Sequence, residues 1–202
     1  GAREPSKPAC GRAEAVPAIA RSSRWPSRAH ALLIAVSAAY CIVVGWRTSQ
    51  SMMPTYDEVV YASQVTRDIP AAMFTAPRAR GMPLLLAPVA VFTPSFFAIR
   101  VYLCLLAGAL LYIAFRPWVK VFDRADGRYA YIPALSAACF ATPWFTLLYG
   151  TMGYPNLWLT FALVAGVGYF YQVATGPTLT WRPVAGVVVA FTAASLIRPT
   201  DA

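Results

Sequence analysis

The stretch Ala31–Trp46 (ALLIAVSAAYCIVVGW) carries no charged residue and is close to the length of a transmembrane helix. A basic, Pro- and Ser-rich segment, 1–29, precedes it, so a cleaved signal peptide is the alternative interpretation. Because this segment is long for the start of a signal and no small-residue cleavage pattern follows Trp46, we interpret the stretch as a membrane anchor. Segment 1–29 shows no apolar periodicity and is predicted to be a disordered cytoplasmic tail.

The composition of the whole chain agrees with a membrane protein. Of its 202 residues, 58% are hydrophobic and only 12% are charged, whereas about 25% charged residues is usual for a soluble domain. The net charge is +9, but the basic residues cluster beside apolar runs, where they set membrane topology. No nucleic-acid partner is therefore expected. Four cysteines without paired spacing and a single histidine also argue against a disulfide framework or a zinc site.

Further apolar runs predict an all-α, polytopic bundle with about five spans, at about 30–48, 100–117, 130–149, 156–173 and 183–198. The third and fourth spans are separated by the turn cluster Gly150–Asn156. The segment 49–99 is predicted to be an outer loop with juxtamembrane helices. Within it, the prolines of 81–99 disfavour a straight helix and favour broken, interfacial or re-entrant ones. A genuine span at 81–99 is the alternative.

The basic residues predict the orientation of this bundle. Six lie in the tail, four in a loop at 116–128 and one in the 174–182 loop, so we expect a plasma-membrane protein with a cytoplasmic N-terminus. The five arginines of the long 47–100 loop do not fit this pattern, but long loops follow the rule poorly. One outer face would then collect the following groups: Asp57, Glu58, Arg78, Arg80, the 150–156 turn and Arg198–Asp201.

Two adjacent acids in Met53–Arg67 (MPTYDEVVYASQVTR) are the first candidates for chemistry. A general base must bring a carboxylate within reach of an acceptor hydroxyl, and Asp57 lies one short connection beyond the first helix. Glu58 points elsewhere on a helix and would orient the acceptor, bind a metal or pair with an arginine. The alternative is structural, because Asp57 or Thr55 is also a suitable N-cap for the helix that follows.

A longer ordered series, over about residues 30–120, supports the catalytic interpretation. It comprises Asp57-Glu58-x-x-Tyr61-Ala62, then Phe74-x-Ala-Pro77-x-x-x-Gly81-Met-Pro83-Leu-Leu, then Ser95-x-x-Ala98-Ile-Arg100-x-Tyr-Leu. This series resembles the amino-terminal part of GT-C glycosyltransferases, in the branch of protein O-mannosyltransferases and lipid A aminoarabinose transferases. The resemblance implies a polyprenyl-phosphate sugar as donor, Asp57 as catalytic base and Glu58 as the second acid of the pair.

An arginine would hold the donor phosphate. Arg198 is the first residue of the sequence Arg-Pro-Thr, which is similar to a motif of some lipid-linked-sugar mannosyltransferases. A guanidinium at the membrane edge binds phosphate bidentately, although an arginine that merely snorkels to the interface is the alternative. Arg78 and Arg80 are further phosphate-binding candidates. Tyr61 and Tyr154 are candidates for sugar contact, with interface anchoring as the alternative for Tyr154. The tryptophans at 118, 144, 158 and 181 are interpreted as interface anchors.

These features lead to one expected function and two alternatives. We expect the chain to be an amino-terminal fragment of a membrane glycosyltransferase that acts on a glycan, lipid or protein acceptor at the extracytoplasmic face. No resident cofactor is identified, and a divalent metal is possible. A transporter is the first alternative, although its ionisable sites would lie within the spans. A non-catalytic membrane scaffold is the second.

Overall fold

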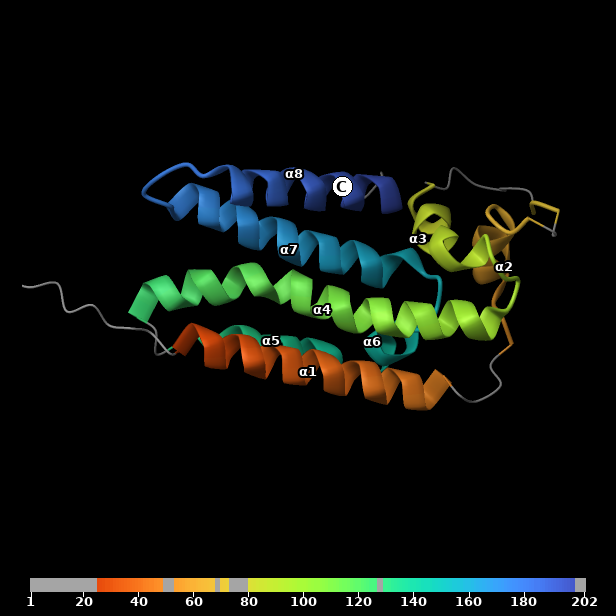
Figure 1. The fold of residues 1–202 in the computed structure, drawn as a ribbon, viewed down its shortest axis with the longest axis horizontal. Coiled ribbons are helices and arrows are strands. Elements are labelled where there is room, and N and C mark those ends of the chain that lie inside the picture. Colours follow the sequence, from red (N-terminus) through yellow and green to blue (C-terminus); the bar gives the residue numbers. More distant parts are fainter. Residues whose placement is uncertain (1–24, 49–52, 68–69, 73–79, 127–128, 199–202) are drawn as a thin grey trace, which may run out of the picture.

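The computed structural model describes residues 25–48, 53–67, 70–72, 80–126 and 129–198. These residues form helices and turns and contain no strand (Figure 1). In chain order the helices are α1 (Trp25–Thr48), α2 (Tyr56–Ser63), α3 (Gly81–Ala90), α4 (Phe96–Asp126), α5 (Ile132–Ala141), α6 (Trp144–Tyr149), α7 (Pro155–Thr175) and α8 (Trp181–Ile197). The predicted all-α class is confirmed for this part of the chain.

The four longest of these helices lie side by side in the order α8, α7, α4, α1 (Figure 1). Helix α5 packs in the angle between α1 and α4, and α6 also contacts α1. Within the described residues, three stretches are long and apolar enough to cross a membrane: Arg28–Arg47, Phe96–Asp123 and Pro155–Thr175. Helix α8 is apolar but shorter.

One end of the bundle gathers the short helices α2 and α3 (Figure 1). Helices α1 and α8 end there, while α4 and α7 begin there, because the chain reverses direction between successive long helices. We call this the α2–α3 end. It holds the acidic pair, Arg80, the 150–156 turn and Arg198, so these groups do share one end of the bundle.

The predicted span at 130–149 is divided into α5 and α6. Pro143 separates them, with an extended backbone at ψ 140°. Proline has no N–H to donate to the preceding turn, and the Thr142 hydroxyl donates to the Cys139 carbonyl there at 3.0 Å. The short α6 is held against α1 by the Tyr40 hydroxyl, which donates to the Thr146 carbonyl at 2.7 Å.

Helix α4 is longer than predicted and includes most of the segment interpreted as the 116–128 loop. It continues through Pro117 to Asp126. The Trp118 indole N–H donates to the Val164 carbonyl of α7 at 3.0 Å, and the Gln172 side chain donates to the Pro117 carbonyl. Packing against α7 therefore supports the helix across its proline.

The proline-rich segment after Arg80 forms a short helix and a turn. Helix α3 has 10 residues and is about 15 Å long, half the thickness of a bilayer core. The alternative of a genuine span at 81–99 is therefore wrong. Pro83 lies in the first turn of α3, where its missing N–H has no helical acceptor anyway, and Pro88 lies in the last turn.

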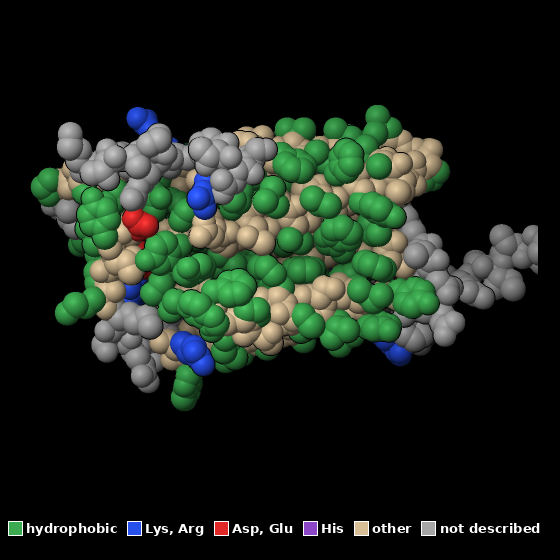
Figure 2. All heavy atoms as spheres, turned by 180° about the vertical axis from the view of Figure 1, so that it is seen from behind, with side chains coloured by type: hydrophobic (Ala, Val, Ile, Leu, Met, Phe, Trp, Pro, Cys, Tyr) green, Lys and Arg blue, Asp and Glu red, His purple; other side chains and the backbone are tan. Residues whose placement is uncertain are grey.

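Exposed tryptophans mark both ends of the bundle. Trp46 is 78% and Trp144 is 70% exposed near the α2–α3 end, and Trp181 is 75% exposed at the other end. Between the ends, hydrophobic side chains cover the visible face (Figure 2). This arrangement suits the two aromatic belts of a membrane protein. Trp158 is different: it is 1% exposed and packs in the core, so its prediction as an interface anchor is wrong.

Candidate functional site

The first turn of α2 is built by a reciprocal cap. The backbone N–H of Thr55 donates to Glu58 Oε2 at 2.9 Å, and the Glu58 N–H donates to Thr55 Oγ1 at 3.5 Å. This capping box satisfies two backbone donors that the helix start leaves open. The N-cap is thus Thr55, and Asp57 lies one residue inside the helix, half-buried.

Glu58 turns into the bundle, where its carboxylate meets Arg100 of α4. The Arg100 guanidinium lies 3.1 Å from Glu58 Oε2, and the two side chains are 8% and 5% exposed. The Gly153 backbone N–H donates to the other oxygen, Oε1, at 3.4 Å. A buried carboxylate needs such partners. Of the three roles considered for Glu58, the structure shows pairing with an arginine, which fixes α2 to α4 and to the turn before α7.

Arg80 and Arg198 belong to chain segments that touch. Gly81, the first residue of α3, lies so close to the Leu196 carbonyl that a Cβ would overlap the backbone there. Arg80 precedes this contact and Arg198 follows it, and both side chains are exposed. The Arg198 guanidinium donates to Asn156 Oδ1 at 2.7 Å. This junction of α3 and α8 concentrates positive charge, and Arg78 lies outside the described residues.

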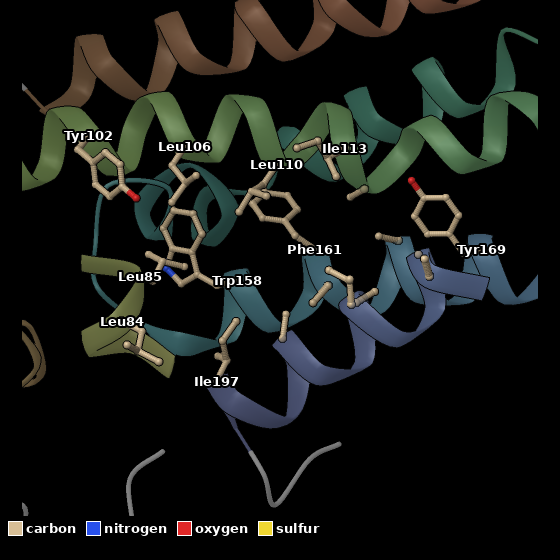
Figure 3. A pocket seen from close by; sticks show the side chains of 18 residues that line it. Leu84, Leu85, Tyr102, Leu106, Leu110, Ile113, Trp158, Phe161, Tyr169 and Ile197 are labelled. Carbon is tan, nitrogen blue, oxygen red and sulfur yellow. The ribbon is translucent and has the colours of Figure 1, made fainter. Parts of the chain in front are cut away.

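An apolar groove runs from this junction along the bundle (Figure 3). It has a volume of about 650 Å³ and lies between α4 and α8, with α7 as its floor and α3 closing one end. Leu84 and Ile197 lie at the α2–α3 end, and the α4 side of the groove extends from Tyr102 to Ala114. This is a rise of about 18 Å. Such a groove suits a long hydrocarbon chain.

The two candidate sugar-contact residues differ in exposure. Tyr61 is 6% exposed and belongs to the hydrophobic core cluster. Tyr154 is half-buried, and its ring centroid lies 5.2 Å from that of Tyr149. The described part of the chain contains no group of three or more His, Cys, Asp or Glu residues placed to hold a metal ion. The possible divalent metal stays a prediction.

Sequence reasoning missed the groove and the role of Arg100 as the partner of Glu58. The groove is made by residues of ordinary transmembrane type on four helices, for example Leu106, Trp158 and Val189. Arg100 could have been found, because it is a charged residue just inside the start of a long apolar run. Comparison of the chain with protein-family models, curated proteins and solved structures gave no match.

Proposed function

We propose that this protein is a membrane glycosyltransferase of the GT-C type, which moves a sugar from a polyprenyl-phosphate carrier to an acceptor hydroxyl. The observation that carries the proposal is a juxtaposition at one end of the bundle. An acid in the first turn of α2, two exposed arginines at the α3–α8 junction and the mouth of a long apolar groove all lie at the α2–α3 end.

The groove and the junction suit the two parts of such a donor. A length of about 18 Å exceeds half of the roughly 30 Å hydrocarbon core, so a polyprenyl chain can lie in the groove within one leaflet. Its phosphate would then reach the junction, where Arg80 and Arg198 can bind it bidentately. The N-terminus of α3 adds a favourable dipole.

The proposed reaction is a single displacement. As the acceptor oxygen attacks the anomeric carbon, Asp57 takes the hydroxyl proton, and the bond between that carbon and the phosphate oxygen breaks. The lipid phosphate leaves with the electron pair, and the arginines stabilise its developing charge. The anomeric centre is inverted. Glu58 acts as a positioning residue, because its oxygens are held by the cap, by Arg100 and by Gly153.

We infer the orientation from the basic residues outside the long 47–100 segment. Six Lys and Arg residues lie in segment 1–29, and Arg116, Lys120 and Arg182 lie toward the end of the bundle opposite α2 and α3. The α2–α3 end also carries arginines, among them Arg47, Arg67 and Arg80, but these belong to a long loop, and long loops follow the positive-inside rule poorly. With the end opposite α2 and α3 in the cytoplasm, the proposed active site lies on the extracytoplasmic face of the plasma membrane, together with its glycan, lipid or protein acceptor.

The phosphate role is tested with Arg198→Gln and Arg80→Gln in the full-length protein. Each change removes a charged hydrogen bond of about 1.5–3 kcal/mol, so we expect kcat/KM to fall by roughly 10–150-fold. Transfer from radiolabelled polyprenyl-phosphate sugars is measured in membranes at matched expression. Arg182→Gln, at the opposite end of the bundle, is the control. Equal activity of all three variants would contradict phosphate binding at the junction, and no wild-type transfer from any donor would favour the transporter.

Binding of the polyprenyl chain in the groove is tested with Ala185→Phe, at the end of the groove farthest from α2 and α3. The new ring would occupy the space of the distal part of a long chain, so we expect KM for a long-chain donor to rise roughly tenfold. KM for a one- or two-isoprene donor should not change, because a short chain does not reach Ala185. Val184→Phe, one residue along α8 and outside the groove lining, is the control. Equal effects on both donors would argue against a chain in this groove.

A further inference from the structure

Two cysteines that are far apart in the sequence lie in contact where α1 packs against α4. Cys41 Sγ and Cys104 Sγ are 3.7 Å apart, although the residues are separated by 63 positions. The Cys104 thiol also donates to the Cys41 backbone carbonyl at 3.1 Å. The argument against a disulfide framework rested on spacing along the chain, which does not account for this pairing.

The two helices approach closely at this point because glycines face the cysteines. A Cβ at Gly108 would lie 2.8 Å from the Cys41 Cβ, and a Cβ at Gly45 would lie 3.3 Å from the Cys104 sulfur. Small residues at four-residue spacing on both helices permit such contact between transmembrane helices. The close approach of the backbones therefore brings the two thiols into contact.

We propose that Cys41 and Cys104 are a modification site, an intramembrane dithiol that is oxidised to a disulfide joining α1 to α4. A disulfide has an S–S distance of about 2.05 Å, so the sulfurs must approach by about 1.7 Å for the bond to form. This inference does not depend on the proposed glycosyl transfer.

The oxidant is a lipid-soluble quinone. Cys41 is half-buried and its neighbours Ile42 and Val43 are exposed on the outer side of α1, so a quinone in the bilayer can reach the pair laterally. Two thiols and one quinone give one disulfide and one quinol: both S–H bonds break, one S–S bond forms, and two electrons and two protons pass to the quinone.

The bond would constrain the segment that carries α2 and α3. That segment lies between the two cysteines in the chain, and Cys104 is about 12 Å along α4 from its first residue. Oxidation therefore closes a covalent loop that contains Asp57 and the Glu58–Arg100 pair.

The test uses the full chain in membranes, with every cysteine except 41 and 104 replaced by serine. Membranes are treated with a short-chain quinone, denatured in SDS and labelled with a maleimide polymer that shifts the gel mobility once per free thiol. We expect two labels before oxidation, none after it, and two again when a reductant precedes labelling. Copper–phenanthroline is applied in parallel as a stronger oxidant.

The matched control keeps Cys41 and the exposed Cys139 but carries Cys104→Ser. Both of its thiols should stay labelled, since the sulfur that Cys41 contacts is that of Cys104, and the exposure of Cys139 would favour its oxidation rather than prevent it. Two labels on the 41/104 protein after either oxidant would overturn the proposal. A disulfide-linked dimer on a non-reducing gel would overturn it as well, as would equal oxidation of the control pair.

Discussion

Asp57→Asn is expected to lower sugar transfer by about 10²–10⁴-fold, the usual contribution of a general base. The amide matches the carboxylate in shape but cannot take the acceptor proton. Because Thr55 and Glu58, not Asp57, make the capping box of α2, the helix should form normally. The loss should therefore appear in kcat, with the expression level and unfolding temperature close to those of the wild type.

The control for this prediction is Asp123→Asn, which removes an acid near the opposite end of the bundle. Its transfer rate should equal that of the wild type. If Asp57→Asn also retains full transfer, the role of Asp57 is limited to its charge in the first turn of α2, a contribution of about 0.3–1 kcal/mol to the stability of the helix.

Arg100→Met is expected to have the largest effect on stability. It leaves the Glu58 carboxylate buried without its ionic partner, and breaking a buried pair in this way costs about 3–5 kcal/mol. The loss should be seen as a lower free energy of unfolding in denaturant titrations of the detergent-solubilised protein. Transfer should fall too, because α2 would no longer be fixed to α4.

The double variant Glu58→Gln/Arg100→Met distinguishes the stability lost by breaking the ion pair from the stability lost by changing the packing of the Arg100 side chain. With no unpaired charge left inside, it should recover part of the stability lost in Arg100→Met. Gln at position 58 can still accept a bond from the Thr55 N–H, so the cap is retained. A double variant that is less stable by the sum of both single changes would show that Glu58 and Arg100 do not stabilise each other.

Much of the architecture is readable from single segments. The stretch Ala31–Trp46 and the runs in α4 and α7 are apolar. In a bilayer, where water is absent, such runs form helices because the backbone N–H and C=O groups must hydrogen-bond with each other. Antiparallel succession of these helices is enough to bring Asp57, the 150–156 turn and Arg198 to one end. Thr55 was one of the two N-cap candidates, but the bond from its N–H back to Glu58 was not predicted.

Other features depend on contacts between distant segments. The sequence predicted that the helix ends near residue 116 and that 130–149 is unbroken, and both predictions are wrong. Helix α4 continues through Pro117, where it packs on α7, whereas Pro143 divides α5 from α6. The same residue type has opposite outcomes: side-chain bonds of Trp118 and Gln172 join the turn at Pro117 to α7, whereas the backbone becomes extended at Pro143.

The helical class, the lengths of the apolar runs and the chemical groups available can be read from the chain alone. Which of these groups meet depends on the packing of the helices: Glu58 with Arg100, Cys41 with Cys104, and the α3 start with the α8 end. A run that is apolar on all sides specifies a helix but neither its buried face nor its partner. Partners are chosen by close packing and by the need of buried charges to be paired.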